Sequence, residues 1–191
     1  MNHLAHLFLA PDNQQARVGS LLGDFARGVV PDELPVRVRE GLYHHRAVDA
    51  FTDRHSEVIA SKRLFSAHRR RFAGVALDIL YDHYLLRNWG HFSDVSPDTF
   101  IDQVYRELDA NSPLMPGSMQ KVTRQIITHD WFRSYMELEN IGYALDRVAG
   151  RIRFSNPFSG IIEEITENDD ELERRFLLFF PELMHFAKEA P

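Results

Sequence analysis

The chain has 191 residues, 44% of them hydrophobic and 26% charged, which is the balance of an ordinary globular protein. This length predicts a single domain over residues 1–191. The absence of cysteine excludes disulfides, thiolate nucleophiles and cysteine-based metal sites. A formal net charge of −6 argues against general nucleic-acid binding.

The first ten residues form a short apolar run that His6 interrupts and that no basic segment precedes, unlike a signal peptide. No later stretch approaches the ~20 apolar residues of a membrane span. We therefore expect a cytoplasmic protein with no membrane partner.

The first half of the chain predicts helices. No run alternates as a half-buried strand would, and β-branched residues are not clustered. The expected helices cover about 14–27, ended by Gly28, then about 35–60 and about 61–89. We expect breaks near Thr52-Asp53 and at Gly74.

The second half continues in the same way. Ser96 can cap a helix that has Pro97 in its first turn, and Asn111-Ser112-Pro113 closes that helix. Further helices are expected near 117–136 and 138–149, and a last one over about 157–188 with a break at Pro181. The prediction is an all-α fold.

Two acids interrupt the most apolar of these helices. Asp78 and Asp82 are four residues apart and project together, while leucines and tyrosines occupy most of the remaining surface. Two carboxylates buried side by side are costly unless a cation or a proton intervenes. A divalent metal is one solution, and pairing with arginines is the other.

A second polar face lies on the preceding helix, where His45 and Asp49 are four residues apart and Asp53 follows one turn later. These residues either complete a His/carboxylate metal site with Asp78 and Asp82 or form an ordinary solvated face.

Single polar residues occur in two other apolar stretches. Asp24 is the one acid in a glycine-rich stretch, where it is either a further ligand or a partner of Arg27. At the N-terminus, His3 and His6 are three residues apart, and His6 is the better ligand candidate because it lies within the apolar run.

A basic segment stands out in this acidic chain: Lys62, Arg63, Arg69, Arg70 and Arg71. Such a run is usually a solvated face, but it can also bind an acidic protein or a phosphate.

These blocks together resemble the acyl carrier protein phosphodiesterase family. The matching segments are MNHLAHLFLA (1–10), GSLLGDFARG (19–28), HHRAVDAFTDRH (44–55) and LDILYDHYLLRNW (77–89), with a looser match over 176–181. Ser20, Phe8 and Tyr43 depart from residues common in relatives.

The resemblance implies an all-α bundle like that of the HD-domain phosphohydrolases. It also implies hydrolysis of 4′-phosphopantetheine from holo acyl carrier protein, with a divalent cation as cofactor. Manganese is the expected ion, and Fe²⁺, Mg²⁺ and Co²⁺ are alternatives. The order Asp82-His83 reverses the His-Asp doublet of HD domains, so ligand roles cannot be copied from them.

We assign roles on this basis. The predicted metal ligands are Asp24, His45, Asp49 and Asp78, and the predicted proton-transfer and supporting catalytic residues are His83, His6 and Asp82. Arg46 is expected to neutralise phosphate charge, while Lys62, Arg69, Arg70 and Arg71 are expected to bind the acidic carrier protein. The alternatives are a hydrolase of small phosphodiesters or nucleotides, and a non-catalytic module that binds carrier protein.

Overall fold

A computed structural model describes residues 1–154 and 156–190, and the described residues form helices and turns without a strand, which confirms the all-α prediction. The helices are α1 (His3–Leu9), α2 (Gln14–Leu22), α3 (Val36–Arg54), α4 (Ser56–Arg63), α5 (Ala73–Arg87), α6 (Pro97–Ala110), α7 (Gly117–Thr128), α8 (Trp131–Ser134), α9 (Leu138–Ala149), α10 (Ile162–Glu167) and α11 (Asp169–Glu189). Short 3₁₀ turns are η1 (Gly23–Phe25), η2 (Pro31–Glu33), η3 (Arg70–Phe72), η4 (Trp89–His91) and η5 (Ser112–Leu114). Among the described helices, none combines the length and apolar character that a bilayer crossing demands.

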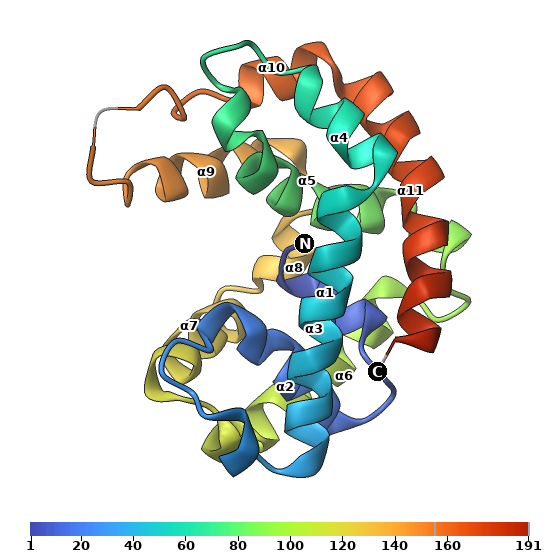
Figure 1. Ribbon diagram of the computed structural model, residues 1–191, viewed down its shortest axis with the longest axis vertical. Helices are drawn as coiled ribbons and strands as arrows, with labels where there is room; N and C mark the ends of the chain where they lie inside the picture. Colours follow the sequence, from blue (N-terminus) through green and yellow to red (C-terminus); the bar gives the residue numbers. More distant parts are fainter. Residues whose placement is uncertain (155, 191) are drawn as a thin grey trace.

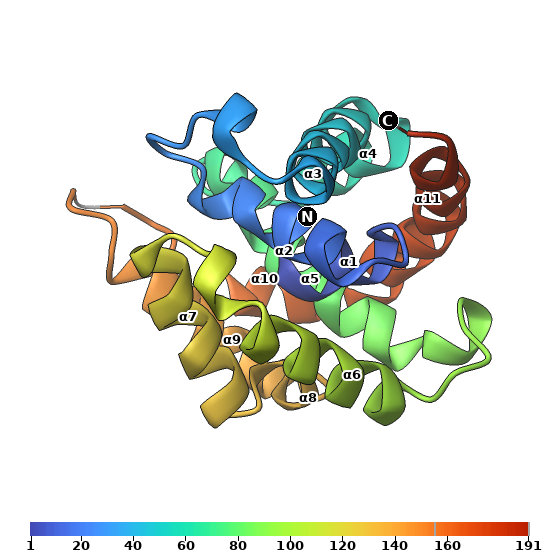
Figure 2. The same cartoon turned by 90° about the horizontal axis from the view of Figure 1, so that it is seen from below.

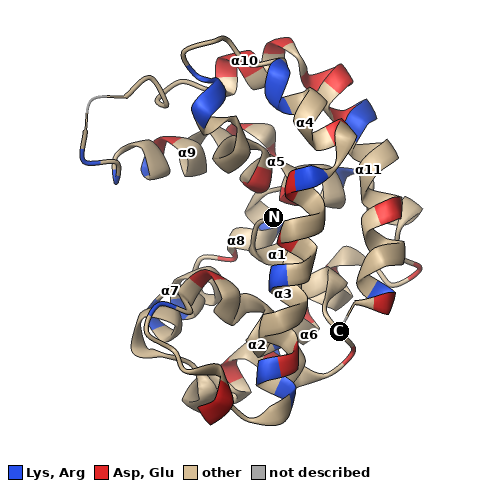
Figure 3. Ribbon diagram, in the orientation of Figure 1, with Lys and Arg blue, Asp and Glu red and all other residues tan. Residues whose placement is uncertain are grey.

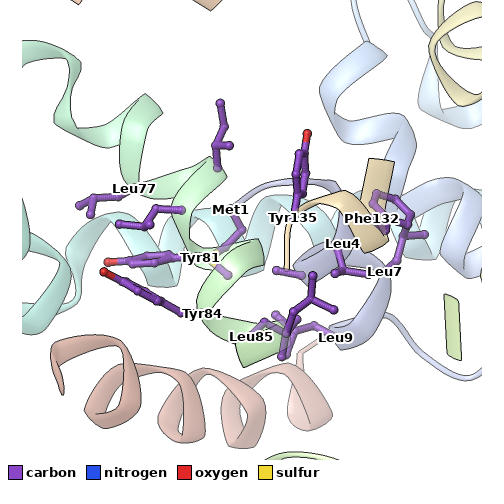
Figure 4. Close-up of a cluster of buried hydrophobic side chains, with 14 of the residues drawn as sticks. Met1, Leu4, Leu7, Leu9, Leu77, Tyr81, Tyr84, Leu85, Phe132 and Tyr135 are labelled. Atoms are coloured by element: carbon purple, nitrogen blue, oxygen red, sulfur yellow. The ribbon is translucent and has the colours of Figure 1, made fainter. Parts of the chain in front are cut away.

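Helix α5 is the central helix, buried nearly all round as its sequence predicts. Its apolar face meets α11, where the ring centroids of Tyr81 and Tyr84 lie 5.3 and 5.7 Å from that of Phe176. Figure 4 shows Leu77, Tyr81 and Tyr84 along this side of α5. The remaining helices surround this core (Figure 1).

Helix α1 is short but central. It packs against α2, α5 and α11, and the view from below in Figure 2 shows it enclosed by these elements and α3. The apolar run of the first ten residues therefore forms a buried helix, and Leu4, Ala5 and Leu7 are fully buried in it.

Helices α2 and α3 pack in very close contact because two glycines face each other's backbone. A Cβ at Gly19 would overlap the carbonyl of Val38, and a Cβ at Gly41 would overlap the carbonyl of Ala16. This contact brings the turn η1, which follows α2, against the middle of α3.

Several predicted boundaries shift. Helix α2 ends at Leu22 and continues as η1, so the helix predicted to reach residue 27 is shorter. The break predicted at Thr52-Asp53 lies at His55, and the stretch 61–89 is interrupted over 64–72, just before Gly74. The cap at Ser96 is confirmed, because its Oγ accepts a hydrogen bond from the Thr99 amide at 3.2 Å.

The break predicted at Pro181 is wrong. Helix α11 runs through Pro181 without interruption, although proline offers no amide hydrogen to the carbonyl four residues earlier. Pro181 is exposed, and Phe179, Phe180 and Leu183 are fully buried around it. The apolar burial on the inner face outweighs the single lost hydrogen bond on the outer face.

Candidate metal centre

Two histidines converge on one carboxylate at the centre of the molecule. The Nε2 atom of His6, on α1, lies 3.1 Å from Oδ1 of Asp49, and Nε2 of His45 lies 3.1 Å from Oδ2 of the same residue. The two imidazole rings stack with centroids 3.8 Å apart. One nitrogen of each ring and one carboxylate oxygen lie within 4.8 Å of one another.

The local sequence explains this convergence. His45 and Asp49 are one helical turn apart on α3 and so share a face. The ring of His45 occupies the space that a side chain at Gly23 would need, since a Cβ there would overlap the imidazole. His6 is held from the other side by α1, whose carbonyl at His6 accepts a 3.1 Å hydrogen bond from Ser20 Oγ.

Charge in this cluster is concentrated on Asp49. Burial lowers the pKa of His6 to about 3, with a smaller contribution from the Met1 ammonium, and outweighs the raising effect of Asp49, so this ring is neutral near neutral pH. Burial alone would raise the pKa of Asp49, but hydrogen bonds from His45 and His6 hold it well below its usual range. A neutral imidazole beside an ionised carboxylate is the state in which both can ligate a cation.

The three donors fit a single divalent ion in type, because imidazole nitrogen and carboxylate oxygen suit zinc, iron and manganese. Both Nδ1 atoms, of His6 and His45, are buried and have no hydrogen-bond partner in the part of the chain that the structure describes. Metal-binding histidines usually donate from that second nitrogen. Here ring stacking, rather than a hydrogen bond, sets the orientation of the imidazoles.

Asp24 stands next to this cluster without joining it. Its Oδ1 lies 4.0 Å from Nε2 of His45, and its Oδ2 lies 2.9 Å from Nδ1 of His3. Burial opposes ionisation of Asp24, but the hydrogen bond from His3 and the nearby histidines lower its pKa. Of the predicted ligands, therefore, His45 and Asp49 are in the cluster and Asp24 is at its edge.

Asp78 reaches the cluster indirectly. The α-amino nitrogen of Met1 lies 3.0 Å from Oδ1 of Asp78 and 3.1 Å from Oδ1 of Asp49, so this ammonium bridges the two acids. Burial lowers the pKa of the amine, yet the two carboxylates outweigh burial and raise it to about 10.

Asp82 faces the backbone of α1 and not the two histidines. Its side chain is fully buried and accepts hydrogen bonds from the amides of Leu4 at 3.1 Å and Ala5 at 2.8 Å and from Nδ2 of Asn2 at 2.8 Å. A carboxylate at a helix N-terminus is favourable because it accepts from otherwise unpaired amides. Burial still dominates and raises the pKa of Asp82 to about 6. Its contacts are those of a residue that positions α1, and through α1 the ligand candidate His6.

His83 is not brought to the cluster. Its Nδ1 lies 2.8 Å from the carbonyl of Tyr135, on another side of α5, and its ring is buried. Arg46 is exposed on α3, with its guanidinium carbon 5.8 Å from the ring centroid of Tyr43.

The basic segment lies beside acidic residues of α10 and α11 (Figure 3). Arg69 donates to the carbonyls of Pro157 at 2.8 Å and Ser159 at 3.0 Å, and Lys62 pairs with Asp53 at 3.1 Å. Arg70 donates to the Phe65 carbonyl at 3.3 Å, and Arg71 is exposed, stacked 4.6 Å over Phe72. Three of the residues predicted to bind the carrier, namely Lys62, Arg69 and Arg70, thus already make hydrogen bonds or ion pairs within the protein.

Two residues near the site have no assigned role in the sequence-based prediction, namely His3, the weaker ligand candidate of the N-terminal pair, and Asn2. His3 contacts Asp24 and Asn2 contacts Asp82, so both extend the polar network from the start of α1. Their one sequence signal is position: in MNHLAHLFLA, His3 and His6 are a single helical turn apart.

Comparison with known proteins identifies related sequences along the whole chain. The family model for acyl carrier protein phosphodiesterase matches residues 1–183. The acyl carrier protein phosphodiesterases of Serratia proteamaculans and Yersinia enterocolitica are each 34% identical over 190 residues, which cover 99% of this chain and 98% of the relative. That of Klebsiella pneumoniae is 30% identical over 189 residues, or 98% of each chain.

No solved structure matches this one, so the predicted relation to HD-domain phosphohydrolases rests on the resemblance alone. The family match, by contrast, covers every segment that builds the His6–His45–Asp49 cluster. The chain belongs to the acyl carrier protein phosphodiesterase family and is a phosphodiester hydrolase.

Proposed function

We propose that this protein is a metal-dependent phosphodiesterase that hydrolyses 4′-phosphopantetheine from holo acyl carrier protein in the cytoplasm. The products are apo carrier protein and free 4′-phosphopantetheine. The proposal rests on the family membership together with one observation, the convergence of His6, His45 and Asp49 within 4.8 Å.

His6, His45 and Asp49 are the residues that would hold the ion, with manganese as the expected metal. When bound, such an ion supplies Lewis acidity to a phosphoryl oxygen and lowers the pKa of a coordinated water toward neutrality. The low pKa of His6, about 3, keeps the ring neutral, and the tautomer protonated on Nδ1 would present the Nε2 lone pair to the ion. Asp24, at the edge of the cluster, adds negative charge beside the three donors, which favours a cation at this position.

The leaving group is the serine oxygen of the carrier, which needs a proton. We assign this proton transfer to His3, because it lies against Asp24 at the edge of the cluster and is partly exposed. His83, predicted for this role, has its Nδ1 against the Tyr135 carbonyl inside the protein. Asp24 would hold the His3 ring in place, as a carboxylate orients a general-acid histidine.

Arg46 is the proposed phosphate-neutralising residue, since it is exposed and directly follows His45 in the sequence. Its guanidinium can form two parallel hydrogen bonds to a phosphate.

The direct test is incubation of the protein with Mn²⁺ and holo acyl carrier protein, followed by mass spectrometry of the carrier. The expected result is loss of the pantetheine arm and its phosphate, giving the mass of apo carrier. An unchanged carrier mass across several carrier proteins and divalent metals contradicts the proposal. Turnover of small diesters or nucleotides without turnover of the carrier supports the smaller-substrate alternative instead.

A further inference from the structure

A pocket of about 480 Å³ opens between the N-terminal segment and helices α5, α7, α8 and α9. In the view of Figure 1, α8 lies between α7 and α9. Its volume lies within the range of small-molecule sites in proteins, about 300–1,000 Å³. None of the residues predicted from sequence to act in the reaction lines it.

The pocket reaches the metal centre through His3. This residue lines the pocket and also places Nδ1 2.9 Å from Asp24, whose other oxygen is 4.0 Å from Nε2 of His45. A second lining residue, Asn2, donates to Asp82 at 2.8 Å. A molecule in the pocket therefore has one end at the edge of the proposed reaction centre.

The pocket wall combines apolar and amide groups. Ile79, Trp131, Ala144 and Val148 supply apolar surface. Three amide side chains also line it, and each uses only part of its hydrogen-bonding capacity within the protein. Nδ2 of Asn140 donates to the Ser134 carbonyl at 2.8 Å, which leaves its Oδ1 as an acceptor.

The other two amides behave in the same way. Nδ2 of Asn2 is used by Asp82, which leaves its Oδ1 as an acceptor. Oε1 of Gln125 lies 3.1 Å from Nε2 of His129, which leaves the Gln125 amino group as a donor. Both kinds of polar partner are thus offered within an otherwise apolar wall.

Two arginines, Arg147 and Arg151, also line the pocket. The Arg147 guanidinium lies 5.9 Å from the ring centroid of Trp131 and covers that side of the indole. A wall that carries two cations and three amides does not suit a long alkyl chain, because these polar groups would lose water without gaining partners.

We infer that this pocket binds the pantetheine arm of the substrate, with the phosphate end at His3, toward the proposed metal centre. The inference rests on the proposed function, which supplies the arm as ligand. Pantetheine alternates short alkyl segments with two amides, and such a chain matches a wall of apolar side chains with amide donors and acceptors between them. The serine of the carrier is then outside the pocket, on the far side of the phosphate.

Substitution of Ala144 by phenylalanine fills the pocket from α9. The matched control is Ala110→Phe, at an exposed position on α6 outside the pocket. A second blocking variant, Gln125→Phe, changes an exposed residue of α7 and so preserves the fold even if Ala144→Phe does not. Circular dichroism melting checks that each variant is folded.

The first measurement is the binding of pantetheine and of 4′-phosphopantetheine. Binding is detected by the shift of the Trp131 indole N–H signal in ¹⁵N NMR spectra. We expect saturable shifts for the wild type and Ala110→Phe, and affinity at least about tenfold weaker for the two blocking variants. The inference is overturned if pantetheine does not shift the Trp131 signal of the wild type. It is also overturned if AMP shifts this signal and pantetheine does not.

The second measurement is kcat/KM for holo carrier protein, which we expect to fall at least about tenfold in Ala144→Phe and Gln125→Phe but not in Ala110→Phe. If both folded blocking variants keep the wild-type value, the pocket inference fails while the proposed function stands. If the wild type itself leaves holo carrier intact, the proposed function fails, and the NMR titration alone decides whether the pocket binds pantetheine.

Discussion

Asp49 carries the ionised carboxylate toward which His6, His45 and the Met1 amine all point. We expect Asp49→Asn to lower turnover of holo carrier protein by about 100-fold or more, because the amide keeps the shape but removes the charge that holds a cation. Calorimetric titration with Mn²⁺, alongside the mass assay, measures both effects.

The control for this substitution is Asp53→Asn, one turn further along α3, where the acid is exposed and pairs with Lys62. It should keep full activity. Wild-type turnover in Asp49→Asn would remove this residue from the metal centre.

The raised pKa of Asp82 predicts how the stability of the protein depends on pH. Its pKa in the folded protein is about 6, above its ordinary 3.8, so the folded state binds more protons than the unfolded state between these values. The free energy of unfolding of the wild type should therefore fall by about 2 kcal/mol, relative to Asp82→Asn, as pH rises from about 4 to about 6. Urea unfolding of both proteins over this range, without metal, checks it; parallel pH profiles would contradict it.

At the residue scale, sequence spacing predicts the pairing of His45 with Asp49, because both lie on one helix. It does not predict that His6 completes the cluster, since this depends on how α1 docks against α3. For the two acids of α5, the helical wheel allows either a shared metal or pairing with arginines. Instead Asp82 accepts hydrogen bonds from α1 and Asp78 contacts the Met1 amine. A helical wheel gives the direction of a side chain, but not the identity of the element it meets.

At the scale of elements, the contact between η1 and α3 depends on Gly23. A methyl group there would overlap the His45 ring, so Gly23→Ala should push the imidazole away from Asp49. We expect kcat/KM to fall by about tenfold or more and stability to fall by about 1–3 kcal/mol. Gly117→Ala, at a position with nothing within 4 Å of the added methyl, should change neither. Full activity in Gly23→Ala would show that this position of His45 is not needed.

The segment between α4 and α5 contains two kinds of arginine: one that is hydrogen-bonded within the protein and one that is exposed and can bind a partner. Arg69 donates to carbonyls of the 157–160 loop, whereas Arg71 is exposed. We expect Arg69→Gln to lower the free energy of unfolding by about 0.5–1.5 kcal/mol, since the carbonyls of this half-exposed loop lose their charged donor. Arg71→Glu should instead raise KM for holo carrier at low salt. Thermal melts and steady-state kinetics separate the two, and unchanged KM in Arg71→Glu would exclude that residue from carrier binding.

The helices themselves were largely predictable from apolar periodicity and caps, as Ser96 illustrates. The continuation of α11 through Pro181 was not predictable. The sequence shows the hydrogen bond that proline removes, but it does not show the burial of Phe179, Phe180 and Leu183 against other helices, which outweighs that loss. Helix α1 was not predicted either, because its few residues are helical through packing on all sides more than through their own pattern.

At the scale of the whole molecule, a bound cation should stabilise the fold, because its proposed ligands lie on α1 and α3. Mn²⁺ at 100 times its dissociation constant contributes about 2.7 kcal/mol. In a chain of this size that raises Tm by roughly 5–10 °C. Differential scanning calorimetry with Mn²⁺ and with a chelator measures it, and Asp49→Asn should show no such difference. Identical wild-type melts in both conditions would argue against a metal bridging these helices.

The anchoring of α1 by Asp82 also bears on the order in which the protein is made. The hydrogen bonds from the amides of Leu4 and Ala5 to Asp82 join positions 78 and 77 residues apart. During vectorial synthesis, α1, which carries His3 and His6, is made before α5 and has no anchor until α5 follows it. The His6–His45–Asp49 cluster is therefore completed late in folding, because one of its histidines depends on a helix that is made later.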